Sequence, residues 1–201
     1  MGKILVVGVG PGGEEYITPA ARRAIAHASA FAGGETALKF APRSKPRMVI
    51  RRDLEEVVEF IKRHADKDVA VLTSGDATLF SILGFLRRRF PEEMLEVVPG
   101  ISSVQLCFAK IKEPWNGARV ISLHGRENAL EGPHGEEKVV IMCDGKNPPH
   151  KVARTLLARL GNRRCAVCEN LTLPGERVVV ATLEDIAGES FSGNSIMVVW
   201  E

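Results

Sequence analysis

The first half of the chain alternates between two hydrophobic periods. Mostly apolar runs at 3–9 and 68–73 end next to small residues, which is typical of strands buried on both faces of a parallel sheet. Between such runs lie segments with helical periodicity, and these follow cap signals: Thr18 precedes Pro19, and Asp53 precedes an acidic turn. Strands separated by helices predict right-handed crossovers and a mostly parallel sheet with flanking helices.

The other elements of this half are predicted in the same way. They are helices over 20–28, 79–90 and 101–110, a helix after Asp53, and a strand over 95–98. A turn-rich stretch at 112–117 then interrupts the apolar pattern, so we place a domain boundary there. The predicted domains cover residues 1–112 and 117–201.

The second half predicts strands that are not all parallel. The expected elements are strands over 119–123, 138–142, 165–171, 177–182 and 195–200, and a helix over 149–160. The segment Leu173–Glu176, which contains Pro-Gly, is a turn sequence between two of these strands, so the two are expected to form a hairpin. The predicted fold class is therefore α/β with two domains, the N-terminal one on a mostly parallel sheet and the C-terminal one on a mixed sheet.

Composition and charge narrow the classes of function. The 201 residues are 45% hydrophobic and 26% charged, which fits a globular chain and excludes intrinsic disorder. With 27 Lys and Arg against 25 Asp and Glu, the net charge of +2 predicts neither nucleic-acid nor membrane binding. No apolar run approaches the roughly 20 residues of a membrane span, and the pattern of a signal peptide is not seen. We therefore expect a cytoplasmic protein.

The cysteines do not predict a covalent framework. Cys107, Cys143, Cys165 and Cys168 are too few and too unevenly spaced for a secreted disulfide scaffold, so we expect them to be reduced. Cys165 and Cys168 form a C-x-x-C pair, but they lie in a predicted strand, where residues three apart face opposite sides. A lone pair of this kind does not predict a metal or redox site.

The glycine-rich segment Gly8–Gly13 follows the first predicted strand and fits G-x-G-x-x-G, the dinucleotide-binding pattern. That pattern needs a helix that begins within the glycines and turns its N–H groups to the pyrophosphate. Here the helix start is at Thr18, and Pro11 removes an N–H group from the loop. The acidic residue expected about 20 positions on could only be Glu35, which instead indicates the start of another helix. An NAD(P)-dependent oxidoreductase stays an alternative that predicts a helix beginning at Gly13.

Two more loops of small residues, 74–78 and 99–103, follow predicted strands of the same sheet. Ligands of open parallel sheets bind outside the carboxyl ends of the strands, so these loops and Gly8–Gly13 are expected to meet at one edge. Each loop alone has a structural interpretation, since Asp76 and the serines after Gly100 could cap helices. Three such loops at one edge favour a ligand site.

Four segments together carry a resemblance to a known family. They are Gly8–Gly12 (G-x-G-P-G), Ser74–Asp76 (a G-D motif), Val98–Ser103 (V-P-G-I-S-S), and Glu169–Arg177 followed by the strand end at 181–183. In order and spacing they resemble the tetrapyrrole methylases, a family of S-adenosylmethionine-dependent methyltransferases. Ser74 stands where many relatives have glycine and Ala77 where many have proline, and neither adds bulk that would close a pocket. The resemblance implies two α/β domains with the cofactor in a cleft between them, in a homodimer.

The resemblance also implies which residues hold the cofactor and the substrate. The implied cofactor contacts are Pro11, Ser74, Gly75, Asp76, Leu79, Ser102 and Ser103 in the first domain, and Met142, Cys143 and the backbone of Leu171 in the second. The implied substrate contacts are Gly10, Gly12, His124 and Arg126. The short chain and the segments 122–126 and 143–148 are most similar to the cobalamin-pathway branch, which methylates C5 of cobalt-precorrin-7.

The implied reaction is the in-line transfer of an activated sulfonium methyl group to an electron-rich ring carbon. Such a step depends on positioning, so we expect no catalytic residue and no metal. The many carboxylates of a tetrapyrrole require basic groups, for which His124 and Arg126 are candidates, with a solvated loop tip as the alternative. Other functions stay open: methylation of another precorrin position or in diphthamide synthesis, the oxidoreductase, or a non-catalytic domain that senses a nucleotide.

Overall fold

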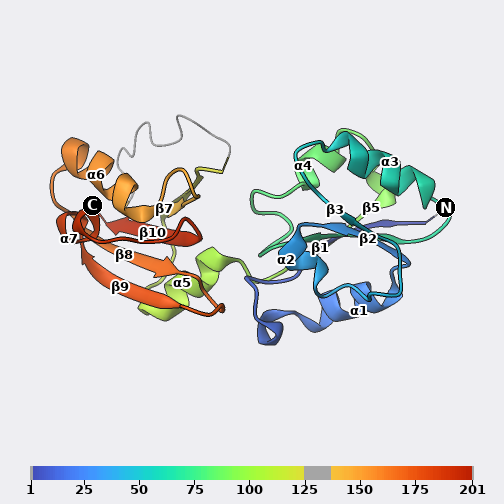
Figure 1. Ribbon diagram of the computed structural model, residues 1–201, viewed down its shortest axis with the longest axis horizontal. Helices are drawn as coiled ribbons and strands as arrows, with labels where there is room; N and C mark the ends of the chain where they lie inside the picture. Colours follow the sequence, from blue (N-terminus) through green and yellow to red (C-terminus); the bar gives the residue numbers. More distant parts are fainter. Residues whose placement is uncertain (1, 125–136, 201) are drawn as a thin grey trace. The chain divides into compact units, whose positions relative to one another are not determined.

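The computed structural model describes residues 2–124 and 137–200 of the chain. It divides into two compact units, Met1–Ser102 and Ser103–Glu201, each built on a five-stranded sheet (Figure 1). The predicted fold class is confirmed, because one sheet is parallel and the other is mixed. None of the described helices combines the length and the apolarity that a membrane-spanning helix needs.

The first unit is built on parallel strands in the order β3-β2-β4-β1-β5. Its elements are β1 (Ile4–Gly8), a 3-10 turn (Glu14–Tyr16), α1 (Pro19–His27), β2 (Ala30–Gly33), α2 (Glu35–Leu38), β3 (Arg47–Val49), α3 (Glu55–Arg63), β4 (Val69–Thr73), α4 (Leu83–Leu86), a 3-10 turn (Glu92–Met94) and β5 (Leu95–Val98). Helices α1 and α2 cover one face and α3 and α4 the other (Figure 1). Leu5 and Val7 therefore pack towards α1, while Ile4 and Val6 pack towards α3. Burial on both faces explains the continuous apolar run of β1.

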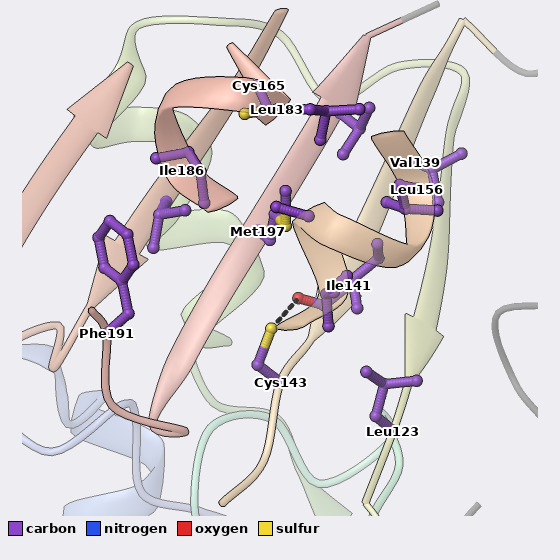
Figure 2. Close-up of a cluster of buried hydrophobic side chains, with 14 of the residues drawn as sticks. Leu123, Val139, Ile141, Cys143, Leu156, Cys165, Leu183, Ile186, Phe191 and Met197 are labelled. Carbon is purple, nitrogen blue, oxygen red and sulfur yellow. Dashed lines mark hydrogen bonds between the residues drawn. The ribbon is translucent and has the colours of Figure 1, made fainter. Parts of the chain in front are cut away.

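The second unit is built on strands in the order β6-β7-β10-β8-β9. Its elements are α5 (Ser103–Ile111), β6 (Ala118–Ser122), β7 (Lys138–Met142), α6 (Pro149–Leu160), β8 (Arg164–Glu169), β9 (Arg177–Thr182), α7 (Leu183–Gly188) and β10 (Ser195–Trp200). Among the described strands of this unit, β6 and β7 alone pair in parallel; the other neighbours, including the predicted hairpin of β8 and β9, are antiparallel. Helices α6 and α7 cover one face, where Ile141, Leu156, Ile186 and Met197 form the centre of a core (Figure 2).

The cysteines of this unit lie on both faces of its sheet. Cys165 belongs to the core beneath α6 and α7 (Figure 2), whereas Cys168 donates from its sulfur to the carbonyl of Cys107 in α5 at 3.8 Å. The predicted opposite orientation of Cys165 and Cys168 is therefore confirmed. All four cysteines are free and buried. Among the described residues, no three His, Cys, Asp or Glu side chains gather as metal ligands.

The structure corrects several expected boundaries. The predicted boundary at 112–117 lies after α5, but α5 packs against β8, β9 and β10 and begins the second unit, which starts at Ser103. The turn-rich composition of 112–117 marked a loop within that unit instead. The predicted helix over 79–90 contains α4 alone as regular helix, because Phe80 has a φ of +48° and the chain can become helical only after it.

Besides the two 3-10 turns, two short strands and one helix were not predicted. The strands β2 and β3 have four and three residues, too few to show a hydrophobic period. The helix is α7, which follows β9 directly: Thr182 accepts from the Asp185 N–H, and the Asp185 carboxylate accepts from Thr182 in return. This capping box starts the helix at Leu183, so the segment 181–183, read in the sequence as the end of a strand, also contains the start of a helix.

Candidate functional site

The loops that follow β1, β4 and β5 leave the same edge of the first sheet. The parallel register places Val7 of β1 opposite Leu72 of β4 and Val98 of β5, so the three strands end side by side. The first two loops are joined by main-chain bonds. The Gly10 N–H donates to the Gly75 carbonyl at 3.2 Å, and the Gly75 N–H donates to the Gly10 carbonyl at 2.8 Å.

The third loop is tied to the second by Asp76. Its Oδ2 accepts from the Gly100 N–H at 2.9 Å, and its Oδ1 accepts from the Thr78 N–H at 2.8 Å and from the Thr78 hydroxyl. Burial alone would raise the pKa of Asp76, but the hydrogen bonds from Thr78, Gly100 and Leu79 outweigh it and lower the pKa below its ordinary value. Asp76 is therefore an ionised brace between two loops. The three motif loops meet at one edge, as the sequence predicted.

Glycine allows these loops to approach at backbone distance. A Cβ atom on Gly100 would lie 2.3 Å from the Gly75 carbonyl oxygen, and one on Gly8 would lie 2.7 Å from the Gly100 nitrogen. Both neighbours are main-chain atoms, which cannot move aside as a flexible side chain can. Gly8 and Gly100 are thus required by the contact of one loop with another.

The loop after β1 does not have the dinucleotide-binding geometry. The helix α1 begins at Pro19, with the Thr18 hydroxyl accepting from the Ala21 N–H at 3.1 Å, as the cap signal predicted. Between the glycines and α1 lies a 3-10 turn at Glu14–Tyr16. The oxidoreductase hypothesis required a helix that begins at Gly13, and this arrangement contradicts it.

The predicted cofactor residues of the second unit also share one edge of their sheet. Both β7 and β8 pair antiparallel with β10, so they run in the same direction. Met142 ends β7, Cys143 follows it, and Leu171 lies just beyond the end of β8. The Cys143 N–H donates to the Ser195 carbonyl at 2.9 Å, which holds the end of β7 against β10.

The side chain of Cys143 points into the hydrophobic core (Figure 2). Its sulfur lies 3.9 Å from the Ile141 carbonyl oxygen. Burial, with a smaller effect of the Asp144 charge, raises the pKa of the thiol to about 12. The thiol is therefore protonated and inert, and a ligand at this edge would meet the main chain of Cys143.

The turn that carries Leu171 has an unusual backbone. Its two neighbours, Asn170 and Thr172, have φ angles of +49° and +67°. Left-handed conformations are unfavourable for residues with a Cβ, and most of all for a β-branched residue such as Thr172. Residues held in this way are concentrated at functional sites, because the surrounding structure must enforce them. The side chain of Leu171 is buried.

The other predicted site residues differ in exposure. Ser74 is exposed just after β4; the half-buried residues are Pro11, Gly12, Leu79, Ser103 and Met142, and the buried ones are Gly10, Gly75 and Ser102. His124 is exposed after β6. Arg126 lies outside the described residues. The contacts of all these residues with cofactor or substrate stay predictions.

Two features of the described residues were not assigned a role from the sequence. Phe80 combines a left-handed backbone with a side chain that is 43% exposed, directly after the second motif. Glu169 and Arg177 were recognised as motif residues without a function, and the structure pairs them, with Arg177 Nε donating to Glu169 Oε2 at 3.0 Å. Their presence in one motif, eight residues apart across a hairpin, is the signal that could have predicted this pair.

Comparisons with known proteins identify the family. A family model described as tetrapyrrole (corrin/porphyrin) methylases matches residues 3–187. The cobalt-precorrin-7 C(5)-methyltransferase of Salmonella typhimurium is 36% identical over 177 residues, which cover 87% of this chain and 88% of that protein.

Two solved structures are similar over almost the whole chain. The precorrin-6Y methylase of Archaeoglobus fulgidus superposes with a TM-score of 0.76 at 25% identity, covering 99% of this chain and 98% of the other. The uroporphyrin-III C-methyl transferase of Thermus thermophilus, solved in complex with S-adenyl homocysteine, has a TM-score of 0.78 at 26% identity and covers 100% of this chain and 98% of the other.

Proposed function

This chain belongs to the tetrapyrrole (corrin/porphyrin) methylases, and from that premise we propose that it methylates C5 of cobalt-precorrin-7. Membership of the family confirms the resemblance seen in the motifs. It also confirms the predicted enzyme class and methyl donor: the chain is an S-adenosylmethionine-dependent methyltransferase. The choice of ring carbon and substrate is the proposal. It is supported by the relative named for that reaction, which matches this chain over most of both lengths.

The observation that carries the proposal is the junction of the three motif loops, with Gly10 bonded to Gly75 and Asp76 bonded to Gly100. The residues there fit a polar donor with a ribose and an amino-acid end. Ser74 is exposed and carries a hydroxyl just after β4, and Ser102 and Ser103 add two more hydroxyls in the third loop. We assign cofactor binding to these serines, Pro11, Gly75, Asp76 and Leu79, and to Met142, Cys143 and Leu171 in the second unit.

The donor supplies a methyl group that is already activated on a sulfonium centre. The residues of the chain therefore have to bind and orient, which can by itself lower a barrier by about 7–11 kcal/mol. The groups at the site suit that role. Asp76 stays ionised and fixed by three hydrogen bonds from the protein, and the Cys143 thiol stays protonated. We assign no residue to proton transfer or to a covalent intermediate.

The substrate side of the proposal rests on charge and shape. We assign substrate contacts to Gly10 and Gly12 in the first loop, and to His124 and Arg126, which would meet the carboxylates of the substrate. Phe80 adds an exposed aromatic face that could stack on the tetrapyrrole ring. We further propose a homodimer in the cytoplasm. Light scattering of the purified protein at several concentrations tests the homodimer, and a monomer throughout would contradict it.

The test of the function is methyl transfer by the purified protein. Cobalt-precorrin-7 is incubated with S-adenosylmethionine, and the product is analysed by mass spectrometry and NMR for one added methyl group and its position. We expect a single methylation at C5. Methylation of another precorrin offered in parallel, with no change in cobalt-precorrin-7, would replace the proposed substrate while leaving the enzyme class intact.

Cofactor binding is measured separately by calorimetric titration with S-adenosylhomocysteine, with NADH as the control ligand. We expect binding of the first and none of the second. Ser74→Val removes the exposed hydroxyl and should weaken binding, whereas Ser29→Val, outside the motif loops, should not. Binding without transfer to any tetrapyrrole would favour the non-catalytic sensing domain.

A further inference from the structure

The turn between β8 and β9 is held at one end by Arg177. Besides its bond to Glu169, Arg177 donates from Nη1 to Glu189 Oε2 at 3.1 Å and from Nη2 to the Ser190 carbonyl at 2.7 Å. Its guanidinium also lies over the ring of Phe191, with Cζ 4.1 Å from the ring centre. One planar side chain thus makes four interactions, and a lysine could not reproduce this fork.

Glu169 and Asn170 continue the same network into the turn. The second carboxylate oxygen of Glu169 accepts from the Ser192 N–H. The side-chain oxygen of Asn170 accepts from the Ser192 hydroxyl at 3.3 Å and from the Asn194 amide at 3.2 Å. The main chain of Asn170 donates to the Asn194 carbonyl at 2.9 Å. The segment before β10 is therefore bound both to Glu169 and to the turn that follows it.

Glu169 is mostly buried, whereas Arg177 reaches the surface: their side chains are 11% and 39% exposed. Burial alone would raise the pKa of Glu169, but the bonds from Ser192 and Arg177 outweigh it and lower the pKa. A carboxylate in this position would lose its main ionic partner if Arg177 were removed. The pair therefore links the buried end of β8 to the surface of the hairpin.

A second ion pair, made by the residue next to Arg177, also holds the turn. Glu176 accepts from the Thr172 N–H at 2.7 Å and from the ammonium of Lys110 in α5 at 2.5 Å. Leu171 lies between Asn170, which directly follows Glu169, and Thr172, which is bonded to Glu176; both neighbours have left-handed conformations. Such conformations persist where the surrounding contacts over-determine them. Here the contacts that do so are the charged groups on either side.

We infer that Arg177, through Glu169, is a positioning residue that holds the main chain of Asn170–Thr172 in the conformation that binds the methyl donor. The inference rests on the proposed role of the Leu171 backbone in cofactor binding. In this role Arg177 acts through Glu169 and not by contact with the ligand. We expect Arg177 to affect the affinity for the methyl donor, and not the affinity for the tetrapyrrole substrate or the rate of the chemical step.

The test compares Arg177→Leu with a matched substitution at the other end of the β8–β9 hairpin. Arg164 is the first residue of β8; it pairs with Glu113 at 3.4 Å and lies over the Trp200 ring at 4.5 Å. Arg164→Leu therefore removes the same kinds of interaction from the same β8–β9 hairpin, at the end away from the turn. Thermal unfolding of both variants records the loss of stability that each substitution causes.

S-adenosylhomocysteine affinity is the main readout. We expect Arg177→Leu to weaken it on the order of 10- to 100-fold, as loss of the residues that orient metal ligands does in other proteins. Arg177→Lys, which keeps the charge, should recover part of the affinity. Arg164→Leu should change it by less than about twofold, as expected for a distant, independent site. In turnover, KM for S-adenosylmethionine should rise with Arg177→Leu while kcat and KM for the tetrapyrrole stay near the wild-type values.

The outcomes separate this inference from the proposed function. If the wild-type protein binds S-adenosylhomocysteine and Arg177→Leu binds it equally well, the positioning role is wrong and the function stands. Equal losses in Arg177→Leu and Arg164→Leu would also overturn it, because stability alone would explain them. If the wild-type protein does not bind S-adenosylhomocysteine, both the positioning role and the proposed function are wrong. Should Arg177→Leu not fold, Glu169→Gln removes the ionic link at its other end and the same criteria apply.

Discussion

The two edges assigned to cofactor binding are stabilised by different means. In the first unit, the loops after β1, β4 and β5 touch through main chain, with glycine at the contacts and Asp76 as the one charged brace among the bonds described. In the second unit, the turn around Leu171 is held by the ion pairs of Glu169 with Arg177 and of Glu176 with Lys110.

This difference decides how each edge tolerates substitution. Main-chain atoms in van der Waals contact leave no space between them, so an added methyl group must displace a strand end. A long side chain can be shortened or exchanged with only a partial loss of its interaction energy, because solvent and neighbouring groups replace some of its contacts. We therefore expect substitutions at the first edge to lower the stability of the protein, and substitutions at the second edge to lower its affinity for the methyl donor. Three substitutions test this contrast.

The largest effect is expected for Gly100→Ala. Its Cβ would lie 2.3 Å from the Gly75 carbonyl oxygen and 2.7 Å from the Gly8 carbonyl carbon. Forcing these loops apart should lower the free energy of unfolding by about 3 kcal/mol or more, measured by urea denaturation. Gly84→Ala is the control, since Gly84 lies in α4 and its Cβ would meet only the flexible end of Arg88, at 4.0 Å. It should stabilise the protein by about 0.5 kcal/mol. Equal effects would mean that the loops are not tightly joined.

A smaller effect is expected for Asp76→Asn. An amide has one acceptor oxygen, so it cannot accept from both Gly100 and Thr78 as the carboxylate does. We expect a loss of about 2 kcal/mol in the free energy of unfolding at neutral pH, since one partly buried N–H group is left without an acceptor. Asp66→Asn, at an exposed position, is the matched control and should change little.

The pH dependence of that difference follows from the lowered pKa of Asp76. The group contributes stability above its unfolded pKa, near the ordinary value of 3.8, and this contribution is lost as pH falls through the lower folded value. The gap in unfolding free energy between wild type and Asp76→Asn should therefore be constant from about pH 7 to about pH 5 and narrow below about pH 4. A gap that widens on acidification would show that the carboxylate is not the stabilising form.

The smallest effect is expected for Gly175→Ala, the same substitution as in the first test but in the second turn. Gly175 has a φ of +81°, yet the nearest atom to an added Cβ is the Asn170 amide nitrogen at 3.7 Å. Only backbone strain opposes the change, so we expect a loss of about 1 kcal/mol by urea denaturation. Gly145→Ala, with an ordinary φ and open space, should be neutral. A loss as large as that of Gly100→Ala would remove the contrast between the two edges.

The predictability of the two edges differs for the same reason. The first edge was found from the sequence because glycine motifs directly after apolar strands mark places where main chain meets main chain. The helix start at Thr18 and the hairpin turn at Leu173–Glu176 were equally local, and both are confirmed. The bracing role of Asp76 was not foreseen, because its partner Gly100 is 24 residues away and on another loop.

The contacts that hold the second edge could be identified only from the folded structure. The pair of Arg177 with Glu169 forms because β8 and β9 are neighbours in the sheet. The further partners of Arg177 are Glu189, Ser190 and Phe191, which lie beyond β9 and α7 in the segment that leads to β10. No local pattern in the sequence specifies that this segment returns to the start of β9, so these contacts could not be predicted.

The sequence by itself determined the α/β class, most strands and helices, and the family, because strand burial, caps and glycine loops depend on neighbours within a few residues. Tertiary structure decided that α5 packs in the second unit and that α4 begins only after Phe80. It also decided which partners Asp76 and Arg177 bind. Those outcomes depend on contacts between residues far apart in the chain, where many partners have the right chemistry and only the packed fold selects one.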